Sequence, residues 1–298
     1  LVYDHPKTRS GGLDVYIDPE EQHDYALTVD VARGVGNDYS AFTVIDITQF
    51  PHKVVAKYRN NEIKPMLFPS IIHEVATSYN DAFILCEVND IGDQVANILH
   101  FDLEYDNILM CSQRGRAGQI VGSGFSGKKS QLGVRMTAAV KKLGCSNLKT
   151  LMEDDKVIMY DYDIISELTT FIQKHNSFEA EEGCNDDLAM CLVIFSWLVA
   201  QVYFKEMTNN DVRKRIYEEQ GGRSKWLRIP IDPEDVFRKH YPLSPSLDRL
   251  DNNKDYTPDN ICLSTRFENW GFNKSTDEIK TECIEKLKQH LKDADVQR

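Results

Sequence analysis

The longest apolar stretch of the chain restricts its folds most strictly. It runs from Leu188 to Phe204, with the sequence LAMCLVIFSWLVAQVYF. Nearly every residue is apolar, so a helix over this range would be covered by protein on most of its sides. Its 17 residues fall short of the roughly 20 that a membrane span needs, and two aspartates precede it. We therefore expect a buried core helix and no membrane partner.

The two aspartates before this run, Asp186 and Asp187, have two explanations. Asn185 is a good N-cap residue, and acidic side chains in a first turn interact favourably with the helix dipole. Capping therefore explains this stretch when it is considered alone. Two other carboxylates favour a metal site over simple capping, because Asp30 and Glu87 each end an apolar run that is typical of a buried strand. Three carboxylates from three buried elements can converge, and converging carboxylates bind divalent metal ions.

The rest of the chain alternates between strands and helices. Three closely spaced β-rich runs predict an antiparallel meander over residues 25–31, 41–47 and 53–58. Further strands are predicted at 82–87, 108–111 and 157–160, and helices at 66–79, 91–99, 134–143, 164–175 and from 186 onward. This order predicts an α/β fold with a mixed sheet flanked by helices. Asp30 would end the first strand, Glu87 the fourth, and Asp187 would enter from a helix on the sheet, which is the layout of the RNase H-like nuclease fold.

Length and charge divide the chain into parts. Its 298 residues suit one large domain with a small appendage. Residues 1–220 carry 21 lysines and arginines against 33 aspartates and glutamates, whereas residues 221–298 carry 14 of each. The Gly221-Gly222 pair marks this change. We expect a linker or N-terminal arm over 1–21, an RNase H-like domain over 22–220 and a separate module over 221–298.

One segment within the acidic part is basic. Between Asn107 and Met152 the chain contains no aspartate or glutamate. A basic face can bind nucleic acid even on an acidic protein, because the local potential rather than the net charge attracts phosphates. The alternative is a solvated loop and helix face. The residues that we expect to contact DNA are Arg114, Arg116, Lys128, Lys129, Arg135 and Lys141.

The predicted cluster of carboxylates indicates a particular chemistry. Phosphodiester hydrolysis needs an activated water and stabilisation of the charge that develops on the phosphate and on the leaving oxygen. Two divalent ions about 3.5–4 Å apart supply both, and hard ions prefer oxygen ligands. We therefore expect one or two Mg²⁺ or Mn²⁺ ions as cofactors, held by Asp30, Glu87 and Asp187.

Four segments share their order and spacing with a known family. They are TVDVARGVGNDYSAFTVID (28–46), ILCEVND (84–90), AAVKKLGCSNLKTLMEDDK (138–156) and AEEGCNDDLAMCLVIFSWL (180–198). Together they resemble the C-terminal nuclease domain of tailed-phage large terminase subunits. The resemblance extends over about residues 20–220. It implies that Asp30, Glu87 and Asp187 are the catalytic metal-binding triad, and that Asp186 and Asp38 are accessory metal-binding acids.

The resemblance also implies a function and partners. Such a domain is a metal-dependent endonuclease that cuts double-stranded viral DNA during genome packaging. It acts in the host cytoplasm, transiently at the procapsid portal, with the small terminase subunit and an ATPase that drives translocation. The seven cysteines form no CxxC pair, which favours reduced thiols in a cytosolic protein.

The chain shows no recognisable ATPase motif of its own. Residues 122–129 (GSGFSGKK) nearly fit a phosphate-binding loop, but Lys129 stands where a hydroxyl should bind Mg²⁺. We therefore expect a basic loop here and the ATPase on another domain or subunit. The chain would then be a fragment or the product of a split gene.

The last part of the chain contains a second pattern of polar residues, at Asp248, Arg249, Asn260, Asn269 and Asn273. This pattern is similar to phage HNH endonucleases. A ββα-metal site of that kind needs a ligand on a hairpin, an asparagine that fixes the turn, and helix ligands one turn apart. Arg249 stands where a histidine base is usual, and asparagine replaces the final histidine. We expect a small HNH-like ββα module, and the alternative is a turn-rich tail without nuclease activity.

Two other functions fit the same residues. One is an RNase H-like junction resolvase or transposase, which would act on branched DNA or transposon ends rather than on linear duplex. The other is a non-catalytic DNA-binding module of the packaging machinery, in which the carboxylates only cap helices and pair with cations. Metal binding separates this second alternative from an enzyme.

Overall fold

The computed structural model describes residues 3–32, 38–113, 118–122, 130–174, 177–208, 210–232, 243, 245–251, 259–265, 267–269, 281 and 285. The chain forms two compact units, which are residues 1–122 with 129–208, and residues 123–128 with 209–298. Among the described residues, every helix falls short of the length and apolarity that crossing a membrane requires. The domain boundaries that we expect at residues 22 and 221 stay a prediction.

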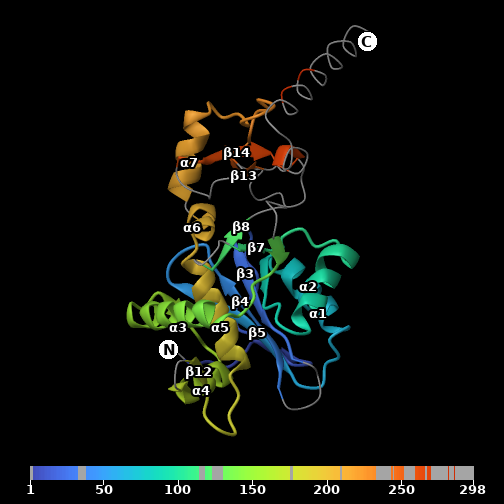
Figure 1. Cartoon of the computed structure of the whole chain (residues 1–298), viewed down its shortest axis with the longest axis vertical. Coiled ribbons are helices and arrows are strands. Elements are labelled where there is room, and N and C mark those ends of the chain that lie inside the picture. The colour runs from blue at the N-terminus through green and yellow to red at the C-terminus, as the bar shows by residue number, and fades with distance from the viewer. Residues whose placement is uncertain are drawn as a thin grey trace. The chain divides into compact units, whose positions relative to one another are not determined.

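The first unit is built on a seven-stranded mixed sheet with the order β1-β2-β5-β4-β3-β6, in which β10 also pairs with β5 (Figure 1). Strands β3, β4 and β5 are antiparallel neighbours, whereas β3 and β6 are parallel. The predicted meander and mixed α/β sheet are therefore confirmed. The strands are β1 (Thr8–Ser10), β2 (Leu13–Val15), β3 (Tyr25–Asp30), β4 (Ser40–Asp46), β5 (His52–Asn60), β6 (Phe83–Cys86) and β10 (Val157–Ile158).

The segment before Gln22, for which we expect a linker or arm, adds two strands to this sheet. Strand β1 pairs with β2, and β2 pairs with β5. A buried ion cluster stabilises this edge, because Lys57 Nζ on β5 lies 3.3 Å from Asp14 on β2 and 2.6 Å from Asp163. The N-terminal segment is therefore bound to the sheet at this point.

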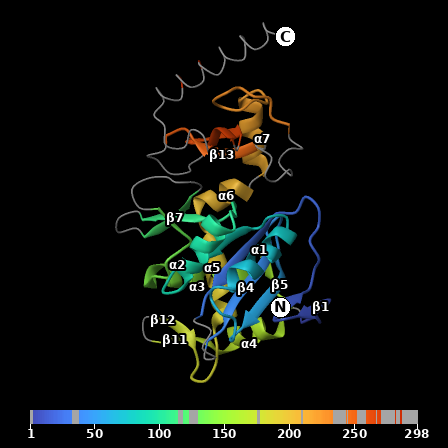
Figure 2. The same cartoon turned by 90° about the vertical axis from the view of Figure 1, so that its right-hand side faces the viewer.

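Helices cover both faces of the sheet. Helices α1 and α2 lie on one face, and α5 lies on the other with α3 packed against it (Figures 1 and 2). The helices of this unit are α1 (Phe68–Ser78), α2 (Gly92–Asn97) with a π-helical turn η1 (Ile98–Asp102), α3 (Ala138–Glu153), α4 (Tyr162–Thr170), α5 (Asp187–Val199) and α6 (Val202–Thr208).

Helix α5 is the predicted core helix, and every residue from 187 to 198 is buried. The Thr28 hydroxyl on β3 donates to the carbonyl of Cys191 at 2.9 Å and attaches the helix to the sheet. On its other side, α3 approaches so closely that a Cβ on Gly144 would lie 2.5 Å from the carbonyl oxygen of Val193. The apolar run does not continue as one helix to Phe204, because α5 ends at Val199 and α6 begins at Val202.

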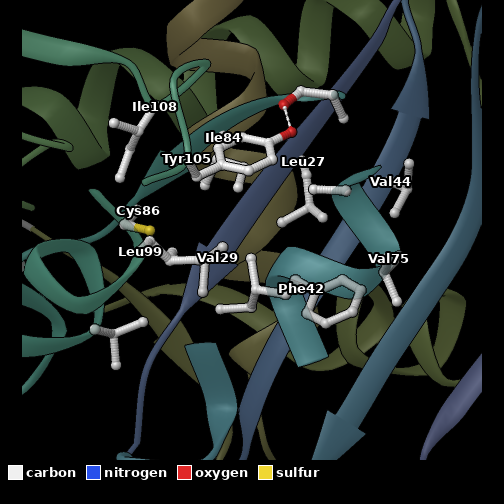
Figure 3. Close-up of a cluster of buried hydrophobic side chains, with 14 of the residues drawn as sticks. Leu27, Val29, Phe42, Val44, Val75, Ile84, Cys86, Leu99, Tyr105 and Ile108 are labelled. Carbon is white, nitrogen blue, oxygen red and sulfur yellow. Dashed lines mark hydrogen bonds between the residues drawn. The ribbon is translucent and has the colours of Figure 1, made fainter. Parts of the chain in front are cut away.

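The opposite face of the sheet packs on α1 and α2 through a large apolar cluster (Figure 3). Leu27 and Val29 from β3, Phe42 from β4 and Ile84 from β6 meet there, and each is fully buried. Tyr105 contributes its ring, and its hydroxyl donates to the carbonyl of Ala82 at 2.6 Å, shown as the dashed line in Figure 3. These apolar contacts fix the positions of β3 and β6, whose ends carry two of the predicted acids.

Two predicted helices have different limits in the structure. The helix expected over 164–175 ends at Thr170, and β11 (Phe171–Lys174) follows and pairs with β12 (Ser177–Ala180) in an antiparallel hairpin. The threonine, phenylalanine and isoleucine at this boundary favour strand over helix. The helix expected over 134–143 begins only at Ala138, because the Thr137 side chain caps it by accepting from the Val140 N–H at 3.3 Å.

The strand predicted at 108–111 is also displaced. Ile108 forms a single parallel bridge to Ile84 of β6, and the strand β7 (Met110–Gln113) begins two residues later. It is the middle strand of a separate three-stranded sheet with β8 (Gln119–Gly122) and β9 (Ser130–Leu132). The chain therefore leaves the main sheet soon after Ile108.

In its described part, the second unit contains α7 (Asn210–Glu219), the antiparallel pair β13 (Pro245–Arg249) and β14 (Ile261–Thr265), and a helical turn over 267–269. Its buried apolar residues include Ile231, Leu247, Ile261 and Leu263. The order of strand, strand and helical turn agrees with a ββα arrangement.

Candidate metal centre

Two of the predicted acids meet where β3 and β6 end. Asp30 is the last residue of β3, and Glu87 directly follows β6. The parallel register pairs Val29 with Cys86, and the Glu87 N–H donates to the Val29 carbonyl at 2.9 Å. Neighbouring positions on adjacent strands project side by side, and the Asp30 and Glu87 carboxyl groups are close enough for each to shift the pKa of the other. Parallel pairing thus brings together two acids that are far apart in sequence.

The third acid reaches this end of the sheet from α5. Asp187 is the first residue of the helix, and its Oδ1 accepts from the N–H of Tyr39 at 3.1 Å. Tyr39 directly precedes β4, in which Ala41 pairs with Asp30. The other oxygen of Asp187, Oδ2, is buried and has no hydrogen-bond partner in the described part of the chain. Asp187 and Asp186 are also near enough to Asp30 for their charges to affect its protonation.

The electrostatics of the three acids disfavour a cluster of bare charges. Burial raises the pKa of Asp30 well above its ordinary value, and repulsion from Glu87 and Asp187 raises it further. Burial also raises the pKa of Glu87, while the interaction with Asp30, the charge of Lys141 and the hydrogen bond from Asn89 act in the opposite direction. It raises the pKa of Asp187 to about 6. A bound cation would relieve this repulsion.

The ligand atoms of these side chains suit a hard divalent ion. Carboxylate oxygens are the ligands that Mg²⁺ and Mn²⁺ prefer, and the buried Oδ2 of Asp187 is a ligand atom without a competing hydrogen bond. As they stand, however, no three His, Cys, Asp or Glu side chains among the described residues are grouped closely enough to enclose an ion. The carboxyl groups would have to move closer together to bind a metal ion jointly.

The two accessory acids lie differently. Asp186 is half-buried at the N-cap position of α5 and contributes to the negative potential at Asp30 and Asp187. Asp38 is exposed, one residue before Tyr39, whose N–H binds Asp187. Both are thus close in sequence to groups of the site, and their metal-binding role stays a prediction.

Asn185, which local sequence offers as a cap, does not cap α5. The N-cap position is Asp186, and its side chain makes no capping hydrogen bond. The free N–H groups of the first turn are bound instead by Glu167 from α4, whose Oε2 accepts from Leu188 at 2.7 Å and from Ala189 at 3.0 Å. Burial raises the pKa of Glu167 to about 7, although these hydrogen bonds and Arg59 act in the opposite direction.

Sequence reasoning missed Glu167. A glutamate in a short amphipathic helix usually faces solvent, and this one is only 4% exposed. Its spacing carried a signal, because it lies three residues after the fully buried Ile164 and therefore on the same helix face. A charged residue on the apolar face of a helix indicates a buried partner.

Only part of the predicted DNA-binding set can be located. Arg114, Arg116, Lys128 and Lys129 lie outside the described residues. Arg135 is exposed. Lys141 on α3 is half-buried, with its Nζ 5.7 Å from the centre of the Phe171 ring, and its charge favours the ionised form of Glu87. Lys141 is therefore beside the acidic cluster.

The HNH-like residues of the second unit are mostly buried and hydrogen-bonded. Asp248 accepts from the Trp226 indole N–H at 3.1 Å. Asn260 binds both the N–H and the carbonyl of Asp251, at 2.9 and 3.0 Å, and so links the residue before β14 to the chain just after β13. Asn269 donates to the Ser246 hydroxyl at 2.9 Å. Arg249 is buried as well, and Asn273 lies outside the described residues.

The fold of this chain is similar to that of solved structures. Two crystal structures of the large terminase nuclease from thermophilic phage G20c, one with bound magnesium and one with bound cobalt, align with TM-scores of 0.50 and sequence identities of 21% and 22%. Each alignment covers 65% of this chain and 92% of the phage G20c chain. At these identities the likeness shows a common fold.

A sequence comparison identifies the family. The model of the Terminase RNaseH-like domain family matches residues 27–203, which include Asp30, Glu87 and Asp187. This match covers more than half of the chain, and it lies over the mixed sheet and helices described above. The chain belongs to the terminase RNase H-like domain family.

Proposed function

We propose that this protein is a divalent-metal-dependent endonuclease that cuts double-stranded viral DNA during genome packaging, as the nuclease part of a large terminase subunit. The observation that supports the proposal is that Asp30 and Glu87 stand at the paired ends of β3 and β6, with Asp187 at the start of α5 near enough for its charge to affect Asp30. Family membership and the metal-bound nuclease structures of similar fold support it.

The three acids would hold one or two Mg²⁺ or Mn²⁺ ions, with Asp186 and Asp38 as accessory ligands. Such ions supply an activated water and neutralise charge that develops on the phosphate. The remaining groups orient the ligands. Asn89 donates to Glu87 Oε1 at 2.8 Å, and the Tyr39 N–H holds Asp187 Oδ1 so that Oδ2 stays available.

The DNA would approach this end of the sheet along basic side chains. Lys141 lies beside Glu87, and its ammonium group can attract a phosphate toward the acids. Arg135 is exposed and begins the segment that leads into α3. Together with Arg114, Arg116, Lys128 and Lys129, these residues would neutralise the duplex backbone. The further partners in this proposal are the ATPase, the portal and the small terminase subunit, met in the host cytoplasm.

Plasmid cleavage tests this proposal. The full chain should linearise supercoiled plasmid in Mg²⁺ or Mn²⁺ and should be inactive in EDTA. Linear duplex should be cut at least as readily as a four-way junction or transposon ends, and the opposite preference would favour a resolvase or transposase. Failure to bind Mn²⁺ in a calorimetric titration would favour the non-catalytic packaging module.

We further propose that residues 221–298 form an HNH-like module that contributes little cutting. The clamp between Asn260 and Asp251 supports this fold assignment, because a turn-fixing asparagine is what such a hairpin needs. Arg249 cannot act as a base near neutral pH, since its guanidinium stays protonated. Residual nicking by the Asp30→Asn protein that disappears on adding Asp248→Asn would show instead that the module cuts DNA.

A further inference from the structure

The first turn of α5 is capped by another helix. Its N-cap residue, Asp186, makes no side-chain capping bond, and the Leu188 and Ala189 N–H groups both donate to Glu167 Oε2. These two residues directly follow Asp187. The carboxylate of Glu167 therefore determines where the helix begins, and with it the place of the Asp187 backbone.

A second set of contacts connects Glu167 to the side chain of Asp187. The Arg59 guanidinium lies 3.9 Å from the centre of the Tyr39 ring, and Tyr39 donates its N–H to Asp187 Oδ1. Arg59 Nη2 is also 3.4 Å from Glu167 Oε1. Glu167 is therefore connected to Asp187 in two ways. One connection runs through Arg59 and Tyr39, and the other runs through the first turn of α5.

These buried charged contacts cost more free energy than apolar side chains filling the same space would. Glu167 is 4% exposed and brings another carboxylate close to an acidic cluster, where the charge of Asp187 opposes the ionisation of Glu167. Apolar side chains of similar volume often stabilise a fold as well as a buried ion pair does. Oxygen Oε1 of Glu167 has no hydrogen-bond partner in the described part of the chain, so the pair with Arg59 does not offset the cost fully. The arrangement is better explained by what it positions.

We propose that Glu167 and Arg59 are positioning residues that hold Asp187 in the orientation needed to bind the divalent ion. Glu167 fixes the position of the first turn of α5, and Arg59 fixes the position of the Tyr39 backbone. The Tyr39 N–H binds one oxygen of Asp187 and leaves the other for the metal. The inference rests on the proposed nuclease function. Partners that orient metal ligands typically change metal affinity or activity by about 10–100-fold when they are removed.

Three variants of the full chain separate positioning from general stability. Glu167→Leu removes the acceptor, Glu167→Gln keeps an oxygen for the two N–H groups, and Arg59→Lys keeps the charge but loses the planar contact with Tyr39. Glu153→Gln is the matched control, because Glu153 belongs to an exposed ion pair with Lys149 on α3. The readouts are kcat and KM for plasmid, Mn²⁺ affinity by calorimetry, and hydrogen exchange at Leu188 and Ala189.

For Glu167→Leu we expect a loss of about 10–100-fold in Mn²⁺ affinity and kcat, with little change in KM for DNA. Hydrogen exchange at Leu188 and Ala189 should become faster. Glu167→Gln should recover most of the exchange protection and part of the activity, and Glu153→Gln should match the wild type. Wild-type kcat and Mn²⁺ affinity in folded Glu167→Leu would overturn the inference.

If Glu167→Leu does not fold, Arg59→Lys decides in its place, and unchanged Mn²⁺ affinity and kcat in that variant would also overturn the inference. Failure of the proposed function looks different, because wild-type protein would then neither bind Mn²⁺ nor cut DNA. The exchange rates at Leu188 and Ala189 would still report whether Glu167 caps α5.

Discussion

Replacing Asp187 by asparagine should stabilise the metal-free protein while removing its activity. Burial raises the pKa of Asp187 from 3.8 to about 6 in the folded state. Each pKa unit corresponds to about 1.36 kcal/mol, so ionised Asp187 lowers the free energy of unfolding by about 3 kcal/mol near pH 7.5. Asparagine resembles the neutral acid and can still accept from the Tyr39 N–H. The helix dipole favours the aspartate by about 0.3–1 kcal/mol, which leaves a net gain of about 2 kcal/mol.

The pH dependence follows from the direction of the shift. Because the folded-state pKa is raised, the stability that protonated Asp187 contributes to the wild type is fully present below pH 3.8. This contribution is lost as the pH rises through about 6. The advantage of Asp187→Asn should therefore be greatest near pH 7.5 and about half as large at pH 5. A divalent ion should reverse the order, since an ion at 100 times its Kd stabilises the wild type by about 2.7 kcal/mol.

Urea unfolding followed by circular dichroism measures these differences, in EDTA at both pH values and then in Mg²⁺. The reasoning is refuted if Asp187→Asn is less stable than the wild type in EDTA at pH 7.5. In that case the Asp187 carboxylate would have a stabilising partner in the protein, and its burial would not indicate a metal ligand.

Three other predictions concern the site, the DNA contact and the core. Asp30→Asn and Glu87→Gln should each abolish plasmid cleavage with an unchanged circular dichroism spectrum, since each removes a ligand charge; cleavage at the wild-type rate would exclude that residue from the site. Neutralising three basic residues should weaken binding to all duplexes and reduce the slope of log K against log salt by up to about 2.7, as fluorescence anisotropy would show, and an unchanged slope would mean a solvated face. The three residues are Lys128, Lys129 and Arg135. Gly144→Ala should cost about 1–3 kcal/mol in urea unfolding, because its Cβ would lie 2.5 Å from the Val193 carbonyl oxygen, and unchanged stability would mean that α3 can move away from α5.

The sheet and two of its acids follow from local sequence. Asp30 and Glu87 each end a run of apolar residues, and a carboxylate at that place stands out because the rest of the strand is buried. The meander was predictable for the same reason, since β3, β4 and β5 are short β-rich runs close together in the chain. Their parallel neighbour β6 could be predicted as a strand, but its register against β3 depends on packing.

The capping of α5 could not be predicted in this way. Asn185 and Asp186 supply local capping chemistry, yet Glu167 from α4 takes that role through tertiary contact. At Phe171 the expected helix gives way to β11, where residues that favour strands pair with β12 in a local hairpin. Only the capping of α5 depends on a contact between elements distant in sequence, and that contact leaves no strong local pattern.

The most direct test is a crystal structure of the full chain grown or soaked with Mn²⁺, with anomalous diffraction used to locate the ion. The account predicts an anomalous peak bound by oxygens of Asp30, Glu87 and Asp187. No peak at this end of the sheet, or a peak bound elsewhere while the three carboxylates keep their present contacts, would contradict it.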